Sequence, residues 1–214
     1  MIAVSTRELV DTATRALRAH GVSYPIARYA ADVVEELHAV DGRGAAILLE
    51  ALSRPVTAAT VHGRTLHAHG GSALLAAATL DDVLIATGEV MVVDIAAPYA
   101  VLPALRRVAA TRGGEWAAEW SDENGDLRGG CHLHPDGRVN VWGDPVSGDP
   151  GLPTVTLHAA HDRHRPLPDH SSTRLPAVTE ALRRARESGI TVARDQWLPL
   201  AHAAQEFLVD TSNQ

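Results

Sequence analysis

The amino-acid sequence predicts an α+β fold, in which an N-terminal cluster of three helices precedes a mixed or antiparallel sheet with packed helices. Apolar residues recur at helical spacing near the start of the chain. The central part instead contains apolar runs and alternating segments of strand type, joined by turn signals and not by regular β–α–β alternation. We therefore expect a helical cluster over residues 1–55 and a sheet domain over 56–214, together forming one compact unit.

Three helices are expected in the first 55 residues. The segment 5–8, Ser-Thr-Arg-Glu, forms a capping box that opens the first helix. Ser23 opens the second helix, which tolerates Pro25 in its first turn and is broken at 41–42 by Asp-Gly. The third helix ends at 54–55, where Arg is followed by Pro.

The central part predicts a buried strand and helix, followed by a three-stranded antiparallel meander. The apolar run 89–95 indicates the buried strand, and 98–112 indicates the helix after it. Residues 115–120 alternate as a half-buried strand does. Asn-Gly at 124–125 and Pro-Asp-Gly at 135–137 are turn signals that connect this strand to two more, over 128–134 and 138–142.

The two faces of this meander are expected to differ in polarity. If the second turn pairs His134 with Arg138, the first face belongs to the core and the second to solvent or a site. The first face carries Cys131, Leu133, Val139 and Val141. The second face carries His132, His134, Arg138, Asn140 and Trp142.

The last third of the chain predicts alternating loops and elements. Pro and Gly make 144–153 a loop, and 161–172 is a surface excursion dense in Pro, His and Arg. The expected elements are a strand over 154–157, a helix over 175–187, a short strand over 190–193 and a helix over 198–208.

Length and composition limit the possible functions. The chain of 214 residues, 45% of them hydrophobic, is long enough for a sizeable core. Its net charge of −7 argues against nucleic-acid binding, because phosphate neutralisation needs a concentrated positive surface. No apolar run approaches the roughly 20 residues of a membrane span. Since no secretion signal is visible at the start, we expect a cytoplasmic protein.

Several kinds of catalytic and cofactor site are excluded by what the sequence lacks. All 19 cationic residues counted as Lys or Arg are Arg, so Walker, Schiff-base and general-base lysines are excluded. Cys131, the single cysteine, cannot form an intramolecular disulfide or a Cys-rich zinc site. The glycine pairs at 113–114 and 129–130 do not stand between a strand and a helix as GxGxxG does. We therefore expect no cofactor beyond a possible divalent metal.

The 12 histidines are the basis of the metal hypothesis. His132 and His134 lie two residues apart on one predicted strand, so their imidazoles share a face. His161 is the expected third ligand, because three imidazoles suit Zn, Fe, Ni or Cu and leave a position open. The alternative is a histidine-rich surface without function, arising from the coding bias that also removed Lys.

Acid–base chemistry is the other hypothesis. His132, His134, His158 and Asp94 are the candidate catalytic residues, and Asp94 ends an apolar strand, where sites gather. Arg43, Arg138 and Asn140 are the candidate substrate-binding residues. Arg43 stands at a helix break, where its guanidinium can grip a carboxylate.

Both ends of the chain show a family resemblance. The N-terminal segments 5–9 and 41–46, and the C-terminal segments 197–201 and 210–214, resemble an uncharacterised bacterial family catalogued as a domain of unknown function. The N-terminal helices also resemble those of the malate/L-lactate dehydrogenases that lack a Rossmann fold. In that group the third helix begins with Asp-Ser-His-Gly, whose histidine is an acid and base toward a 2-keto acid. Here Arg43 takes that position, and an arginine cannot shuttle a proton near neutral pH.

Three functional hypotheses follow. The first is a nicotinamide-independent enzyme that uses His/Asp acid–base chemistry, with or without a metal, on a carboxylate- or carbonyl-containing metabolite, as a lyase, isomerase or hydrolase. The second, implied by the resemblance, is an NAD(P)H-dependent reductase of keto or imino acids. The third is a non-catalytic partner subunit. In each case we expect a homodimer, because the helical cluster is rich in Ala and poor in aromatic residues.

Overall fold

A computed structural model describes residues 1–143, 154–160 and 173–210, and it confirms the α+β class. The described chain divides into two compact units. A helical unit contains residues 1–56 and 178–214, and a sheet unit contains 57–177. This division differs from the expected boundary, because residues 178–214 group with the helical cluster and not with the sheet. Within the described ranges, no helix combines the length and apolarity needed to cross a membrane.

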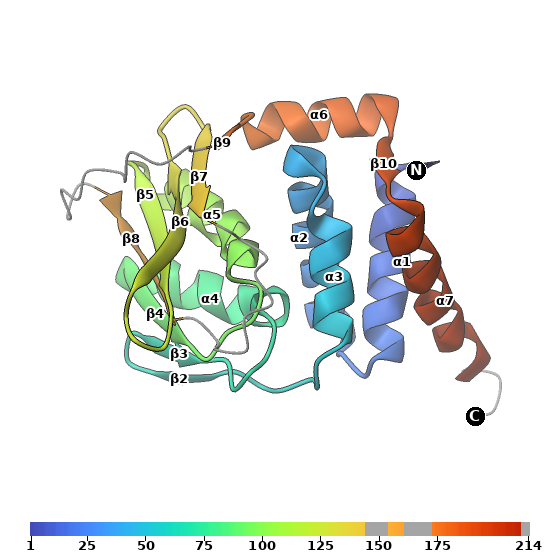
Figure 1. Cartoon of the computed structure of the whole chain (residues 1–214), viewed down its shortest axis with the longest axis horizontal. Helices are drawn as coiled ribbons and strands as arrows, with labels where there is room; N and C mark the ends of the chain where they lie inside the picture. Colours follow the sequence, from blue (N-terminus) through green and yellow to red (C-terminus); the bar gives the residue numbers. More distant parts are fainter. Residues whose placement is uncertain (144–153, 161–172, 211–214) are drawn as a thin grey trace. The chain divides into compact units, whose positions relative to one another are not determined.

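The helical unit is built around α1, which packs against α2 and α7 (Figure 1). A two-stranded antiparallel sheet joins the start of the chain to the segment between α6 and α7. This pairing, together with the packing of α6 on α2, accounts for the return of the C-terminal segment to this unit. The elements are β1 (Ile2–Val4), α1 (Thr6–Ala19), α2 (Tyr24–Asp41), α3 (Gly44–Leu52), α6 (Val178–Ser188), β10 (Ile190–Val192) and α7 (Arg194–Asp210).

Local signals place the first helices as expected. Ser5 is the N-cap of α1, and its hydroxyl oxygen accepts a 3.1 Å hydrogen bond from the backbone N–H of Glu8. Ser23 is the N-cap of α2, and Pro25 stands in its first turn. Gly44 begins α3 at a point of close approach, because a Cβ there would lie directly against the backbone oxygen of Val34 and against His38.

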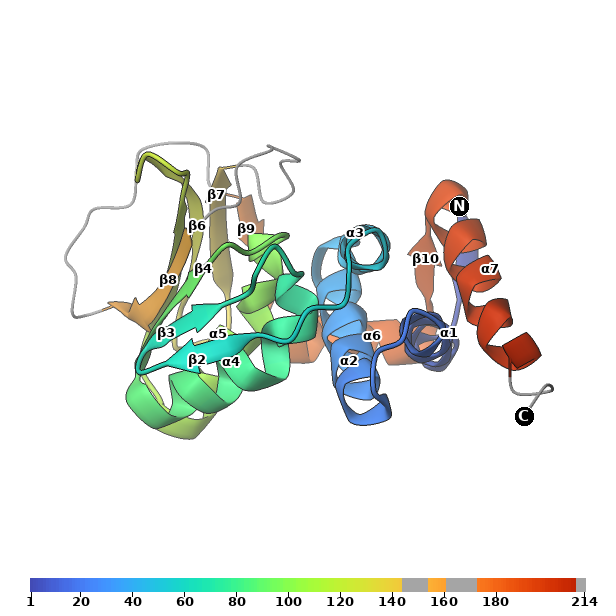
Figure 2. The same cartoon turned by 90° about the horizontal axis from the view of Figure 1, so that it is seen from below.

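The sheet unit contains an eight-stranded sheet in the order β2-β3-β4-β8-β5-β6-β7-β9 (Figure 2). Strands β3 and β4 are parallel and the other pairs are antiparallel, and the predicted meander is confirmed as β5-β6-β7. The strands are β2 (Thr60–His62), β3 (Thr65–His67), β4 (Glu89–Val93), β5 (Trp116–Ser121), β6 (Leu127–Leu133), β7 (Val139–Gly143), β8 (Thr154–Ala159) and β9 (Thr173–Leu175).

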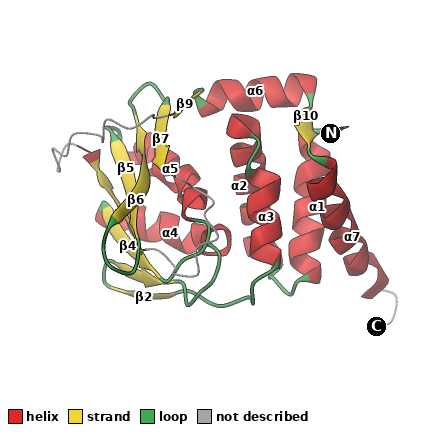
Figure 3. Ribbon diagram, in the orientation of Figure 1, coloured by secondary structure: helices red, strands yellow, loops and turns green. Residues whose placement is uncertain are grey.

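Helices α4 (Ala73–Thr87) and α5 (Leu102–Arg112) pack on this sheet, with a short 3-10 helix, η1 (Pro98–Val101), before α5 (Figure 3). The sheet face with the predicted core residues of the meander is buried, as expected: Cys131, Leu133, Val139 and Val141 are at most 6% exposed. Burial raises the pKa of the Cys131 thiol to about 12, so this cysteine is an inert core residue.

Two tryptophan side chains pack against the glycine pair of β6, Gly129 and Gly130. A Cβ on Gly129 would meet the indole of Trp120, and a Cβ on Gly130 would meet the indole of Trp142. Because successive residues of a strand point to opposite faces, one indole lies on each side of the sheet. Trp142 is only 6% exposed although it stands on the face expected to be polar, because the missing side chain of Gly130 leaves room for its ring.

Several predicted boundaries differ from the observed ones. The helix expected over 175–187 begins at Val178, because Leu175 belongs to β9 and pairs with Val139. The last helix begins at Arg194, four residues before the expected start, and continues through Pro199. Helix α4 and strands β2 and β3 were not predicted. The loops predicted over 144–153 and 161–172 lie outside the described residues.

Candidate functional site

Strand register aligns six residues in a row across the sheet. Residues that pair directly across strands point to the same face, so their side chains share one side of the sheet. The row, which we call the polar row, runs through β4, β8, β5, β6, β7 and β9. Its members are Glu89, His158, Ala117, His132, Asn140 and Arg174. The sheet thus brings together two of the predicted catalytic histidines, which are 26 positions apart (158 − 132) in sequence.

A cluster of possible ligands lies at one end of this row. The rings of His132 and His134 have centroids 4.4 Å apart and are tilted by 53°. Nε2 of His132 lies 3.3 Å from Oε2 of Glu115, the residue that precedes β5. One possible ligand atom from each of these three side chains lies within 4.8 Å of the others. Sequence reasoning did not select Glu115. Regular pairing outward from Ser121 and Leu127 would place it opposite Leu133, and the register shift after Trp120 brings it opposite His134.

The imidazole nitrogens of His132 form few interactions with the surrounding protein. Both nitrogens are buried and neither makes a hydrogen bond of good geometry in the described ranges, although Nε2 faces the Glu115 carboxylate at 3.3 Å. Burial and the neighbouring His134 lower the pKa of His132, while Glu115 acts in the opposite direction. The ring is therefore neutral near pH 7 and retains a nitrogen lone pair.

His158 is held in a defined orientation. Its side chain belongs to a residue only 5% exposed, and its Nδ1 lies 3.0 Å from the backbone oxygen of Ala159. Since a carbonyl only accepts, Nδ1 carries the proton and Nε2 has the lone pair. Nε2 is buried, with no hydrogen-bond partner among the residues that the structure describes. The lone pair of Nε2 is therefore not used by any described residue.

The remaining predicted residues of the sheet unit divide into two groups. Asn140 belongs to the site, with its Nδ2 3.0 Å from Nε2 of His134. Arg138 is exposed and forms an ion pair with Asp136 within the β6–β7 turn. Asp94 is exposed at the end of β4 with a φ of 59°, so it lacks the buried surroundings that we expected for it.

Two predicted residues do not belong to the described part of the sheet unit. Arg43 lies in the helical unit at the start of α3, where its Nε is 3.3 Å from Oδ2 of Asp41. That contact makes Asp41 a local partner of the guanidinium at the helix break. His161, the expected third metal ligand, lies outside the described residues.

An open groove of about 430 Å³ borders the polar row. It shares Glu89 with the row, whereas Trp116 and Ala159 of its lining pair with each other one position along and so point to the opposite face of the sheet. The groove is lined by Arg64, Thr87, Gly88, Glu89, Arg112, Gly113, Gly114, Trp116 and Ala159. A Cβ on Gly113 or Gly114 would meet no atom within 4 Å, so these glycines leave open space in the groove.

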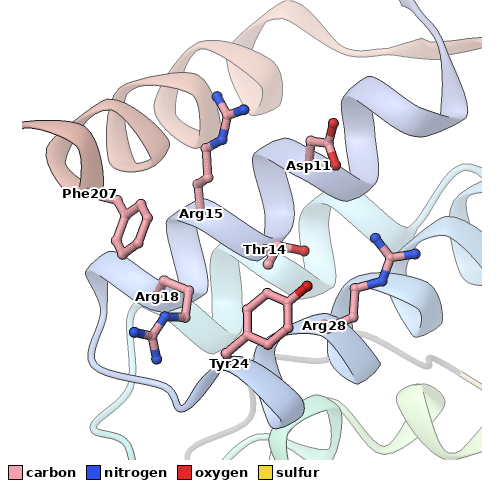
Figure 4. Close-up of a pocket in the computed structure, with 7 residues that line it drawn as sticks. All are labelled: Asp11, Thr14, Arg15, Arg18, Tyr24, Arg28 and Phe207. Atoms are coloured by element: carbon pink, nitrogen blue, oxygen red, sulfur yellow. The ribbon is translucent and has the colours of Figure 1, made fainter.

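The helical unit has a smaller pocket of about 270 Å³ (Figure 4). Its lining residues are Asp11, Thr14, Arg15, Arg18, Tyr24, Arg28 and Phe207. Two of its guanidinium groups already have structural partners. Arg18 donates to the backbone oxygen of Val22 and lies 5.7 Å from the ring centre of Phe207, and Arg28 pairs with Asp32 at 2.9 Å. The polar row is the better candidate site, because Nε2 of its His158 is buried without a hydrogen-bond partner among the described residues.

The fold of the chain is that of dehydrogenases and reductases. A protein of E. coli to which a malate/lactate dehydrogenase activity has been ascribed matches with a TM-score of 0.62 and 11% identity, over 97% of this chain and 96% of that one. Malate dehydrogenase from Pyrococcus horikoshii OT3 gives 0.59 and 10%, over 96% and 95%. Δ1-piperideine-2-carboxylate reductase from Pseudomonas syringae pvar. tomato gives 0.50 and 13%, over 95% and 100%. No family model and no curated protein matches the sequence.

These similarities correct two predictions. The expectations of a nicotinamide-independent enzyme and of no cofactor are contradicted by the fold comparison, because the structural neighbours are dehydrogenases and a reductase. The prediction was based on the absence of a GxGxxG loop, which is the signature of a different dinucleotide-binding fold. The resemblance of the N-terminal helices to malate/L-lactate dehydrogenases agrees with the fold comparison, at identities that show the fold alone.

Proposed function

We propose that this protein is a nicotinamide-dependent reductase that acts on the C=O or C=N group of a small carboxylate-containing compound. The observation that carries the proposal is the match to malate/lactate dehydrogenase folds over 97% of the chain. Support from the site comes from buried imidazole nitrogens without partners in the described part of the chain, because a bound polar molecule would satisfy them.

The groove beside the polar row has features that fit part of a dinucleotide. Its volume of about 430 Å³ lies within the usual range of ligand pockets, roughly 300–1,000 Å³. The open space above Gly113 and Gly114 lets a ligand approach the backbone closely. The exposed guanidinium of Arg64 lines the same groove, where it pairs with Glu89 at 3.3 Å, and it can turn from that carboxylate toward a phosphate. When bound, a reduced nicotinamide supplies a hydride to the substrate carbon.

His158 is the proposed proton-transfer residue. In its protonated form, the imidazolium gives the proton on Nε2 to the substrate oxygen or nitrogen as the C=O or C=N bond is reduced. In the reverse direction, the Nε2 lone pair accepts the proton of the hydroxyl or amine. The carbonyl of Ala159 holds Nδ1–H in both states, which keeps the ring oriented.

The proposal is tested by mixing the protein with NADH or NADPH and either a 2-keto acid or a cyclic imino acid, and following cofactor absorbance. We expect one pair to react, and we expect kcat/KM to fall by about 10²–10⁴-fold in His158→Gln. The matched control is His62→Ala, since His62 is exposed on β2, and it should leave kcat/KM unchanged. No turnover with any pair, and no thermal stabilisation by either cofactor, would refute the proposal.

A further inference from the structure

We propose that Glu115, His132 and His134 form a binding site for a divalent transition metal ion, with Zn²⁺ as its best occupant. The proposal is independent of the reductase function, because metal binding is measured directly. It differs from the metal site expected from the sequence in its third ligand, which is a carboxylate of the neighbouring strand in place of His161.

The register of β5 and β6 brings the three side chains together. Ala117 pairs with His132 and Trp116 with Leu133, so the next position along each strand places Glu115 opposite His134. Alternation along the strands then puts all three side chains on the same face as the polar row. Cys131 points to the opposite, buried face, so its thiol does not compete for the ion.

The measured separations agree with a tetrahedral site. In such a zinc site, ligand atoms about 2.0–2.2 Å from the metal stand about 3.3 Å apart. Nε2 of His132 and Oε2 of Glu115 are 3.3 Å apart. The largest separation within the set of ligand atoms is 4.8 Å at most, and rotation of the Glu115 side chain, which is 42% exposed, can shorten it. The 53° tilt between the two rings lets their nitrogens converge.

Unsatisfied hydrogen-bonding capacity is the second argument. His132 has two buried nitrogens without hydrogen-bond partners in the described ranges, an arrangement that costs free energy unless another group fills the space. A cation beside Nε2 would satisfy the lone pair and also neutralise the carboxylate of Glu115. Neutral imidazole and carboxylate ligands together are a typical set for Zn²⁺, as in the two-histidine, one-glutamate sites of metallohydrolases.

Asn140 has the position of a supporting residue. Its amide lies 3.0 Å from Nε2 of His134. When the amide presents its oxygen, that atom accepts Nε2–H and leaves the Nδ1 lone pair of His134 for the metal. A hydrogen bond from the second nitrogen of a ligand histidine to a polar group is the common arrangement in metal sites.

The test uses protein prepared without a histidine tag and stripped of metal. Titration with Zn²⁺ is followed by calorimetry, and titration with Co²⁺ by its visible absorption, which reports tetrahedral coordination. We expect one equivalent to bind at this site, with binding weakened by about 100-fold or more in Glu115→Gln and in His134→Ala, and by about 10-fold in Asn140→Leu.

The chain supplies a matched control. His67 and His69 are a second pair two residues apart, with ring centroids 6.0 Å apart, and no carboxylate is grouped with them in the described part of the chain. His67→Ala/His69→Ala should retain full binding. Circular dichroism of each variant shows whether it is folded, and Glu115→Gln, at a half-exposed position, removes only the charge.

Unchanged Zn²⁺ affinity in both Glu115→Gln and His134→Ala would overturn the proposal, as would a larger loss in the control pair. Absence of binding to the unaltered protein would also overturn it. None of these results would alter the reductase proposal, whose test depends on His158 and cofactor binding.

Discussion

Each unit contains a histidine with a lowered pKa, the buried His38 in the helical unit and the partly buried His132 in the sheet unit, and the two side chains differ in how their nitrogens are used. In the helical unit, Nδ1 of His38 accepts a 3.4 Å hydrogen bond from Ala45 N–H, and its Nε2 lies 3.2 Å from the backbone oxygen of Thr191. In the sheet unit, His132 has no hydrogen-bond partner for either nitrogen among the described residues. Burial is the main cause of the lowered pKa in both.

This difference shows that a lowered pKa does not by itself indicate a functional histidine. His38 connects α2, α3 and β10, so its nitrogens are consumed by the architecture of the helical unit. His132 makes no such connection, and its nitrogens remain available for a ligand. The number of nitrogens left after the protein's own hydrogen bonds is therefore the better criterion.

The largest effect on stability is expected at the helix junction that holds His38. Gly44→Ala would press a Cβ against the backbone oxygen of Val34 and the side chain of His38, and we expect a loss of about 3 kcal/mol in the free energy of unfolding. Chemical denaturation measures the loss. Ala46→Gly, two residues along α3, is the control for helix propensity and should cost about 1 kcal/mol. Equal stability of Gly44→Ala and the natural protein would contradict the close packing of α2 and α3.

Replacing the partnered histidine is expected to destabilise the protein. His38→Leu leaves Ala45 N–H and Thr191 C=O without their partner, at a cost of about 2 kcal/mol near pH 8. Because the pKa of His38 is lowered in the folded state, the unfolded chain binds more protons, and this histidine's contribution to stability falls as the pH drops below about 6.5. The difference between variant and natural protein should therefore shrink in acid. Denaturation at pH 8 and pH 5.5 measures it, and a growing difference would reverse our assignment.

Replacing the unpartnered histidine is expected to have the opposite sign. In metal-free protein, His132→Leu removes buried nitrogens that make no hydrogen bond in the described ranges, so the free energy of unfolding should rise by about 1 kcal/mol. Thermal unfolding with and without chelator measures this change. A loss as large as that of His38→Leu would show that His132 is as firmly integrated as His38, and the contrast between the units would disappear.

An effect as small as that of His132→Leu, but of opposite sign, is expected at the N-cap of α1. Ser5→Ala removes the acceptor of the Glu8 N–H and should cost about 1 kcal/mol. Ser5→Asp retains an acceptor and should restore most of the stability, as measured by thermal unfolding. Failure of Asp to restore it would show that the cap bond does not stabilise the helix.

Elements with local signals were predictable from the sequence. The capping serines of α1 and α2 and the turn signals of the β5-β6-β7 meander act within a few residues, so the sequence places them correctly. Helix α4 was not predicted because Ala and Leu occupy most of its faces, which leaves no clear amphipathic period. The membership of residues 178–214 depends on the β1–β10 pairing and on the packing of α7 on α1 and of α6 on α2, which no local pattern shows.

The candidate site was likewise predictable only where a local signal places its residues. A single turn places His132, His134 and Asn140 on one face, and the sequence therefore groups them correctly. His158 enters the row through the pairing of β5 with β8, which are separated by two other strands in the chain, so its position depends on the whole sheet. The glutamate of the cluster precedes the first regular residue of β5, and its role depends on the register of the neighbouring strand.

The polar row depends on regular residue pairing across five strand interfaces. The sheet does contain an irregularity, a shift between Trp120 and Ser121, but it lies past the row, toward the opposite end of β5. Ser121 pairs with Leu127 and Trp120 with Gly129, so Arg128 is an extra residue of β6, and without it regular pairing would place Ala117 opposite Cys131. That one extra residue therefore decides which side chains of β6 join the polar row.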